Sequence, residues 1–389
     1  MSAPHQAGTT APPNRPALSP DRRQADLPGP YHPLQGLRVI EFCWVWAGPF
    51  LGQFLADLGA EVIKIEWYDR FDVYRTRGTE LLRGTAPDAV FREMSPSFQS
   101  LNRNKVDFCV NLKEPEGVDL IKRLARASDL VIENWSHGTL ERLGVGYAAL
   151  KEANPLLVML SLSAFGPSSR LAAMRSYGLV TSALGGAEAP LRVDDELVGS
   201  PTFNVSDPNA ALFGLLGALG ALLEARASGS GSNLVVAQLE AVMSLMEQAP
   251  GQDRDPWVHG VFTCADGRHA AVSVPAHGDH DDLAALCAAA PLEQVLADIG
   301  ALGGHAAEVL NVIDTPAAPV FADLETRIAT EHPVTGRGDV IAAPWRINGR
   351  RAPVRKPAPL LAEGNLHVLR NILGLDDAAI ADLQSRRIV

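Results

Sequence analysis

Asp207 is the residue in this sequence whose setting most strongly suggests chemistry. It lies in the tripeptide Ser206-Asp207-Pro208, directly before an apolar run from Ala210 to Glu224 that has helical length and no β-branched residue. Aspartate is a common N-cap, and proline is tolerated in a first helical turn because its missing N–H would be unpaired there. The spacing alone therefore predicts an N-cap, and capping is the simplest role for this acid.

A second group of candidates is positively charged. Lys113, Arg142 and Arg175 fall near the ends of predicted strands or in loops after them, and the basic stretch Asn102–Lys105 precedes a strand. Ligands of open α/β sheets bind outside the carboxyl ends of the strands. Several cations at that edge would suit a polyphosphate ligand. The alternative is an ordinary solvated surface, which spacing alone favours.

Other catalytic patterns are weak or missing. His277 and His280 lie three residues apart among acidic residues, but an acidic helix start explains them better than a metal cluster, and we expect no metal. The first predicted strand is not followed by G-x-G-x-x-G, which argues against an ordinary NAD-dependent dehydrogenase. The segment Ser163–Gly166 does not supply the G-x-S-x-G of a serine hydrolase.

The elements that must position these residues alternate along the chain. Predicted strands cover residues 37–42, 61–66, 106–112, 129–134 and 156–163, and predicted helices cover 50–58, 115–127 and 139–153. Repeated alternation of this kind predicts an α/β fold with a doubly wound, mostly parallel, Rossmann-like sheet. After about residue 250 the pattern changes to short strands around Asp266-Gly267, which is typical of a hairpin in a smaller α+β domain.

These patterns suggest a domain plan. We expect a large domain formed by residues 34–245 together with 340–389, and a small domain over residues 251–335. The first 33 residues are rich in proline, alanine and polar groups and contain no apolar core of a secretory signal, so we expect a disordered tail.

Composition narrows the possible partners and compartments. The formal charge of −11 argues against a nucleic-acid binder, and no apolar run reaches the length of about 18 residues expected of a membrane span. The four cysteines form no C-x-x-C pair and lie mostly in apolar surroundings. A soluble protein in the reducing cytoplasm fits these features best.

An ordered series of short motifs resembles the class III CoA-transferases, the family that includes formyl-CoA transferase, carnitine CoA-transferase and α-methylacyl-CoA racemase. The resemblance covers roughly residues 34–245 and returns at 340–389. The motifs are Leu37–Phe42, Ala47-Gly48-Pro49, Leu55–Glu66, Asn102–Lys105, Leu112-Lys113 with Pro115-Glu116-Gly117, Glu133-Asn134, Arg142-Leu143-Gly144, Asn154-Pro155 and Ser161–Gly166.

The resemblance implies covalent catalysis by Asp207. Its carboxylate would attack an acyl-CoA thioester, and an aspartyl-CoA thioester would then pass CoA to an acceptor acid. Coenzyme A would be a substrate thioester, bound at residues that match the family's pattern or replace its members. These are Trp46, Ala47, Trp67, Val110, Lys113, Asn134 and Trp135, with Arg142 and Arg175 at the phosphates or the adenosine.

The resemblance also implies an interlocked homodimer. Segments near residues 225–250 and 325–350 would serve as linkers that pass through the partner. A heteromer with a homologous chain is an alternative assembly.

The chain departs from the family's pattern at several positions. Trp46 replaces a frequent glutamine, and Trp67 replaces a residue that is basic in formyl-CoA transferase. Tyr177-Gly178 stands where the racemase branch has a His-Asp pair, so the second base of racemisation is missing, and Gly178 replaces an acid of the best-known members. Transfer of CoA is therefore the first hypothesis, with a non-catalytic or partner-dependent CoA-binding homologue and an acyl-CoA racemase or epimerase as alternatives.

Overall fold

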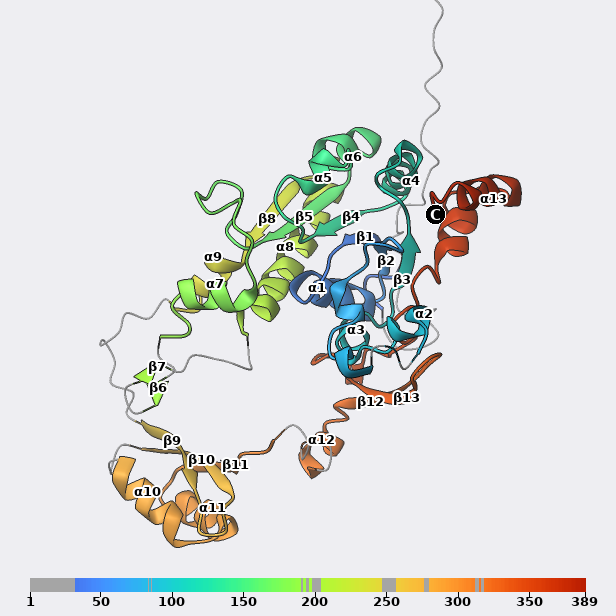
Figure 1. Cartoon of the computed structure of the whole chain (residues 1–389). Coiled ribbons are helices and arrows are strands. Elements are labelled where there is room, and N and C mark those ends of the chain that lie inside the picture. Colours follow the sequence, from blue (N-terminus) through green and yellow to red (C-terminus); the bar gives the residue numbers. More distant parts are fainter. Residues whose placement is uncertain are drawn as a thin grey trace, which may run out of the picture.

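The computed structural model describes residues 32–389 apart from 83, 85, 190–191, 194–195, 198–203, 247–256, 276–279, 312–314 and 316–317. A six-stranded parallel sheet forms the centre of this structure (Figure 1). Its order is β3-β2-β1-β4-β5-β8, so the winding direction reverses between β1 and β4. The strands are β1 (Arg38–Phe42), β2 (Glu61–Glu66), β3 (Val106–Cys109), β4 (Leu130–Glu133), β5 (Val158–Ser163) and β8 (Asn233–Ala237). The predicted parallel α/β sheet is confirmed, whereas the predicted tail lies almost wholly outside the described residues.

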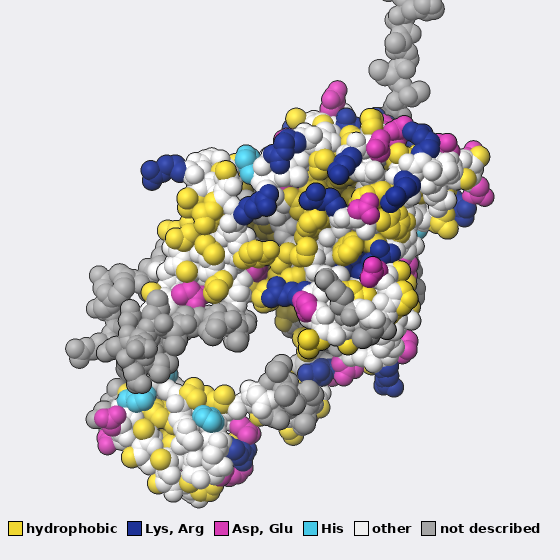
Figure 2. Space-filling view, in the orientation of Figure 1, with side chains coloured by type: hydrophobic (Ala, Val, Ile, Leu, Met, Phe, Trp, Pro, Cys, Tyr) yellow, Lys and Arg dark blue, Asp and Glu magenta, His cyan; other side chains and the backbone are white. Residues whose placement is uncertain are grey.

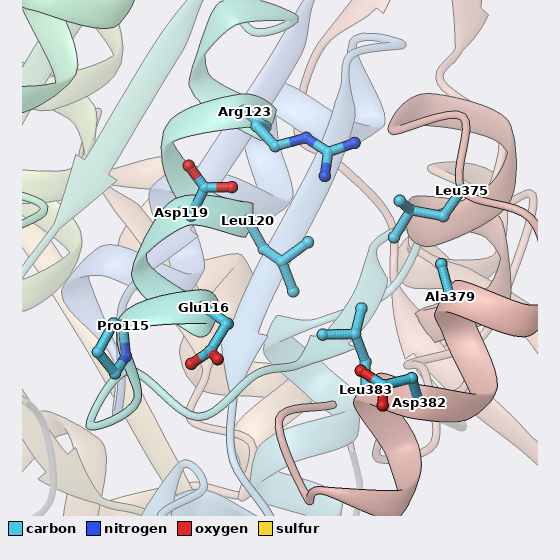
Figure 3. A pocket seen from close by; sticks show the side chains of 9 residues that line it. All are labelled: Pro115, Glu116, Asp119, Leu120, Arg123, Leu375, Ala379, Asp382 and Leu383. Atoms are coloured by element: carbon cyan, nitrogen blue, oxygen red, sulfur yellow. The ribbon is translucent and has the colours of Figure 1, made fainter.

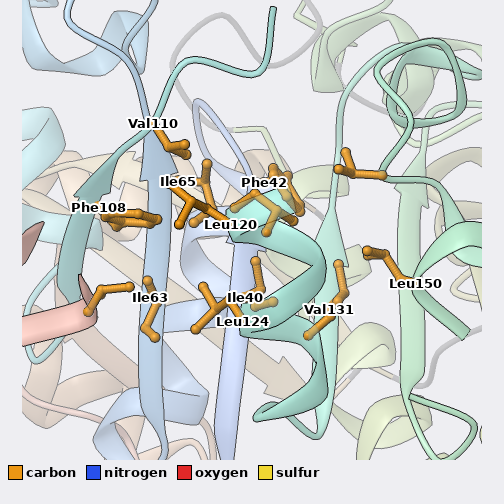
Figure 4. Close-up of a cluster of buried hydrophobic side chains, with 14 of the residues drawn as sticks. Ile40, Phe42, Ile63, Ile65, Phe108, Val110, Leu120, Leu124, Val131 and Leu150 are labelled. Carbon is orange, nitrogen blue, oxygen red and sulfur yellow. The ribbon is translucent and has the colours of Figure 1, made fainter. Parts of the chain in front are cut away.

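Helices cover both faces of the sheet because its strands alternate two sets of apolar side chains. Ile40 and Phe42 point to the face covered by α4 (Pro115–Arg126), where they pack with Leu120 and Leu124 (Figure 4). Val39 points to the other face, which is covered by α1 (Ala47–Asp57) and α8 (Ser206–Ser228). The first core also includes side chains of α5 (Thr139–Arg142), α6 (Tyr147–Ala153) and the C-terminal α13 (Asp377–Ser385).

Two sequence expectations differ from the observed elements. The predicted helix over residues 139–153 is two helices, since Gly144 adopts a left-handed φ of 75° between them. Part of the predicted linker over 225–250 is strand β8, which pairs with β5 through Met159 to Ser163. This part of the chain therefore belongs to the sheet.

Helix α8 is unusual in being apolar on every side. It has 23 residues, and its length and hydropathy alone would suffice for a membrane span. Only a third of its most apolar window is buried inside the structure. Small residues such as Ala210, Gly214 and Ala218 face the core. On the outer side, Leu216 is 71% exposed and Leu223 is 68% exposed. The helix therefore covers the sheet and leaves an apolar face uncovered within this chain.

A smaller body has its own sheet and core. Strands β9 (Trp257–Thr263), β10 (His269–Pro275) and β11 (His305–Glu308) are antiparallel, and β9 and β10 form the hairpin predicted around Asp266-Gly267. Helices α10 (His280–Ala289) and α11 (Leu292–Ala301) pack on this sheet.

The other short elements described are η1 (Val73–Arg75), η2 (Glu80–Leu82), α2 (Asp88–Phe91), α3 (Pro96–Leu101), α7 (Gly178–Leu184), α9 (Gln238–Met243), α12 (Pro319–Asp323), the hairpins β6–β7 (Arg192–Val193, Glu196–Leu197), β12–β13 (Arg327–His332, Gly336–Ile341) and β14–β15 (Arg346–Ile347, Arg350–Arg351), and a π-helix over His367–Ile372.

Buried charges attach the long loop after β2 to the sheet. Arg75 donates to Glu66 at 2.8 Å and to Glu93 at 2.6 Å, and it also pairs with Asp107 at 3.2 Å. The side chains of Arg75, Glu66 and Asp107 are fully buried. Such charges are tolerated in a core only when they are paired and hydrogen-bonded. Arg75 also reaches the carbonyl of Pro359, so the network joins the loop to the C-terminal segment.

Candidate active site

The loops after β1 and β4 meet at the point where the sheet reverses its winding. Asn134 accepts a hydrogen bond from the backbone N–H of Trp44 at 2.9 Å and donates one to the Trp44 carbonyl at 2.8 Å. Trp135 packs edge-on against Trp44, with ring centroids 5.6 Å apart. The buried indole Nε1 atoms of both tryptophans have no acceptor within the described part of the chain. Unpaired buried donors are rare in proteins, so these two suit a polar ligand.

The loop after β1 turns sharply at Val45. The φ of this residue is 71°, a left-handed conformation that β-branched residues rarely adopt. The buried carboxylate of Asp72 accepts hydrogen bonds from the N–H groups of Val45 and Tyr74, both at 3.0 Å, and Lys64 donates to its second oxygen at 3.0 Å. This contact supports the strained turn that leads into Trp46.

Tyr74 packs beside the loop after β1. It belongs to a small apolar cluster against which Val45 and Trp46 pack. Burial raises the pKa of Tyr74, Arg77 lowers it, and the negative charge of Asp207 adds to the rise.

The predicted N-cap role of Asp207 is wrong. Asp207 is the second residue of α8, Val205 is the N-cap, and no side chain caps the helix. The carboxylate is instead held by two primary amides. Gln238 donates to Oδ1 at 2.9 Å, and Asn204 donates to Oδ2. Asp207 is free of the capping role because its side chain turns toward these amides.

The surroundings of Asp207 alter its acidity. Burial raises the pKa of Asp207 above its usual range, and the hydrogen bonds from Gln238 and Asn204 oppose part of that rise. A titratable group shifted by burial in this way is a candidate functional residue.

The remaining predicted site residues lie after the carboxyl ends of the strands, in different settings. Trp67 follows β2 and packs edge-on against Tyr68 at 5.2 Å. Val110 is only 1% exposed, so its side chain belongs to the core and only its backbone could meet a ligand. The cations are all exposed, and Figure 2 shows Lys and Arg side chains among apolar atoms on one face of the molecule. The predicted cationic site residues are Lys113, Arg175 and Arg142. The guanidinium of Arg142 donates to Thr139 Oγ1 at 2.9 Å.

Glu133 lies at the end of β4, next to Asn134. Burial raises its pKa to about 7, and hydrogen bonds from Ser161 and from the N–H of Trp135 limit the rise. It is therefore a second titratable group at the carboxyl edge of the sheet.

A surface groove elsewhere contains none of the predicted site residues. It lies between α4 and α13, has a volume of about 550 Å³, and has an apolar floor of Leu120, Leu375 and Leu383 with acidic side chains around it (Figure 3). In the described ranges, no group of three or more His, Cys, Asp or Glu side chains could hold a metal ion. The predicted weak cluster around His277 falls partly outside those ranges.

Sequence reasoning missed four residues that shape the site: Asp72, Tyr74, Asn204 and Gln238. A signal existed for Gln238. It follows Leu234–Ala237, an apolar run typical of a buried strand, and polar residues directly after parallel strands often serve ligand sites. The other three have no comparable signal, because none of them directly follows a predicted strand.

Comparison with known proteins decides the family. Residues 34–285 match the sequence model of CoA-transferase family III. The chain therefore belongs to CoA-transferase family III. This CoA-transferase is 29% identical over 408 residues to a succinyl-CoA–D-citramalate CoA-transferase of Chloroflexus aurantiacus, which covers 92% of this chain and 99% of the relative.

Two further similarities also cover most of the chain. A human succinyl-CoA:glutarate CoA-transferase is 26% identical over 95% of this CoA-transferase and 92% of its own length. Among solved structures, a CAIB/BAIF family protein from Brucella suis superimposes with a TM-score of 0.75 at 23% identity, covering 88% of this chain and 100% of that one. The structural likeness supports the fold that the parallel sheet already shows.

Proposed function

We propose that this CoA-transferase moves CoA from an acyl-CoA donor to a carboxylic acid acceptor through covalent intermediates on Asp207. The observation that carries the proposal is the setting of this carboxylate. It is half-buried at the start of α8, it is hydrogen-bonded at both oxygens, and burial raises its pKa. Membership of the family and the activities named for its relatives support transfer of CoA as the reaction.

The proposed reaction begins at the donor thioester. An oxygen of Asp207 attacks the thioester carbon, a C–O bond forms, the C–S bond breaks, and CoA leaves as a thiolate. The thiolate then attacks Cγ of Asp207, which forms the aspartyl-CoA thioester and expels the donor acid as a carboxylate. The acceptor carboxylate next attacks the same Cγ and releases the thiolate, which takes the acceptor's acyl group and frees Asp207. Each step exchanges one bond for another without a proton transfer, so the split into several steps needs only one nucleophilic side chain.

We propose that the CoA moiety lies across the loops after β1 and β4. The unpaired indole N–H groups of Trp44 and Trp135 face polar ligand atoms there, and Trp46 and Ala47 form the floor. Lys113, Arg142 and Arg175 bind the phosphates, since exposed cations after parallel strands suit them. Trp67 lines the same edge and can stack on the adenine.

We further propose that a second copy of this chain covers the apolar face of α8 in an interlocked homodimer. Exposed apolar side chains are concentrated on α8 and its neighbours α7 and α9, and a face of this kind is typical of a subunit interface. They are Leu179, Val180, Leu184, Leu212, Phe213, Leu216, Leu223 and Met243. The division into a large and a small domain is part of the same proposal. The expected molar mass in light scattering is twice that of the chain, and a stable monomer would count against the dimer.

We place the enzyme in the cytoplasm. All four cysteines are free and buried, as expected for a protein of a reducing compartment.

The covalent step can be tested by trapping. Incubation with succinyl-CoA and hydroxylamine should convert Asp207 to a hydroxamate that mass spectrometry detects in its peptide. Asp207→Ala should abolish both transfer and trapping while the protein stays folded. Asp376→Ala is the matched control, because Asp376 is a true N-cap whose Oδ1 accepts from Ala379 at 2.8 Å. It should cost about 1 kcal/mol of stability without loss of transfer. Full turnover by Asp207→Ala would remove Asp207 from the mechanism.

A further inference from the structure

We propose that Gln238 is a positioning residue that, together with Asn204, holds both oxygens of Asp207 and stabilises the charge that forms on the aspartyl group during transfer. The inference rests on the proposed function. Gln238 is the first residue of α9, directly after β8, and it is buried with 9% of its surface exposed. Its amide donates to Oδ1 of Asp207 at 2.9 Å, and the amide of Asn204 donates to Oδ2.

Hydrogen-bond chemistry fixes the direction of both amides. An ionised carboxylate can only accept, so each amide must present its NH₂ group to Asp207. The amide oxygen of Asn204 faces the N–H of Ser206 at 3.0 Å and the hydroxyl of Ser182 at 3.2 Å, which are both donors. The amide oxygen of Gln238 lies 3.4 Å from the hydroxyl of Thr181. The amide oxygen of Asn204 therefore faces two donors, whereas the amide oxygen of Gln238 shares the single hydroxyl proton of Thr181 with the Gly178 carbonyl, which lies 2.8 Å from that hydroxyl.

These donors come from two separate elements. Thr181 and Ser182 lie in α7, Ser206 begins α8, and the three side chains are completely buried. The hydroxyls of Thr181 and Ser206 lie 2.9 Å apart, so the two amide supports are joined. A buried hydrogen-bonded network of this kind restricts its groups to few arrangements. Asp207 is thus oriented before any substrate arrives.

The same donors serve the covalent steps. When one oxygen of Asp207 is acylated, the other keeps its amide donor. Attack of the CoA thiolate on Cγ forms the S–C bond and moves the C=O electron pair onto that oxygen. The oxyanion then re-forms the carbonyl and expels the donor carboxylate. A preorganised N–H donor at the oxygen that becomes charged lowers the barrier of such a step.

A set of glutamine variants tests this role. Gln238→Leu removes the donor but keeps a side chain of similar size, and Gln238→Glu keeps the shape but replaces the donor with a second carboxylate. The matched control is Gln294→Glu, since Gln294 donates to Asp298 at 2.8 Å on the exposed surface of α11. Transfer is measured as kcat and as KM for succinyl-CoA over the acidic range of pH, together with hydroxylamine trapping at Asp207.

We expect Gln238→Leu to lower kcat roughly 10- to 100-fold with little change in KM, because one donor to a charged oxygen is lost. The acidic limb of its kcat–pH profile should move to higher pH, since the Asp207 carboxylate with fewer hydrogen-bond donors holds its proton more tightly. Gln238→Glu should be slower still and shifted further, whereas Gln294→Glu should match the unaltered enzyme.

The kcat values and pH profiles of Gln238→Leu and Gln238→Glu distinguish a positioning role of Gln238 from a packing role. If Gln238 only fills space, Gln238→Leu leaves both kcat and the acidic limb of the pH profile unchanged, and only Gln238→Glu, which adds a like charge, moves that limb. That outcome overturns the inference while leaving the proposed function intact. Absence of transfer and of trapping in the unaltered enzyme would instead reject the proposed function itself.

Discussion

Gly178 leaves open the space in which Asn204 reaches Asp207. A Cβ atom at position 178 would overlap both Asn204 Nδ2 and Asp207 Oδ2. The backbone conformation at this position is not the left-handed one that favours glycine, so conformation alone does not require glycine here. The amide of Asn204, which precedes α8, therefore occupies the space beside Asp207 that a side chain at position 178 would fill.

Gly178→Ala should displace Asn204 and lower transfer by roughly 10- to 100-fold, since one oxygen of Asp207 would lose its donor. Steady-state kinetics with succinyl-CoA measure the effect. Gly300→Ala provides the control, because a Cβ there meets no atom within 4 Å. It should stabilise α11 by about 0.5–1 kcal/mol without changing the rate. Normal turnover by Gly178→Ala would mean that the site tolerates an intruding methyl group.

Asp72 is expected to matter for both stability and substrate binding. Asp72→Ala leaves the N–H groups of Val45 and Tyr74 without their acceptor and removes one partner of Lys64, so we expect a loss of about 3–5 kcal/mol in urea unfolding. If the loop after β1 binds CoA, KM for the acyl-CoA should rise as well. Asp72→Asn keeps an acceptor for the two N–H groups, so its KM should rise less. Equal KM values for both variants would argue that the turn at Val45 does not depend on this acceptor.

Glu133 should make stability depend on pH. Its pKa is about 7 in the fold, above the value near 4.3 of an unfolded chain. The folded state therefore favours the protonated form, and that contribution is full below about pH 4 and lost as pH rises through about 7. Glu133→Gln imitates the protonated form. Between pH 5 and pH 8 the unaltered protein should lose roughly 2 kcal/mol more stability than the variant. Urea unfolding at several pH values measures this, and parallel curves for both proteins would contradict the assignment.

The parts of the fold that could be predicted are those set by local periodicity. The strand over Glu61–Glu66 and the hairpin around Asp266-Gly267 follow from apolar runs and turn residues that lie next to each other in the sequence. The winding of the sheet follows from repeated strands and helices. Strand β8 was not predicted, although the turn residues Gly229–Ser232 precede it and Leu234–Ala237 is an apolar run.

The site was harder to predict because its geometry depends on distant partners. The Ser-Asp-Pro pattern correctly indicated a helix start, but proline is tolerated throughout a first turn, so the pattern could not fix which residue is the cap. The amides of Asn204 and Gln238 lie 3 and 31 residues from Asp207, and only packing of α7, α8 and α9 brings them to its two oxygens. The left-handed φ of Val45 is also invisible in the sequence, since valine is among the residues least suited to it.

Variants of Arg75 test whether buried ion pairs attach the loop after β2 to the sheet. Arg75→Met leaves Glu66 and Glu93 without their cation, and breaking a buried pair costs about 3–5 kcal/mol, so we expect a protein that is barely folded or insoluble. The triple variant Arg75→Met, Glu66→Gln, Glu93→Gln removes these two carboxylates together with the cation. Asp107 is kept, because burial beside Glu66 raises its pKa well above the usual range. The triple variant should recover much of the lost stability, because replacing a whole buried ionic group is far less costly than removing one partner. Urea midpoints compare the three proteins. A triple variant as unstable as the single one would show that Arg75 acts through its contacts with Phe98 and the Pro359 carbonyl rather than through these carboxylates.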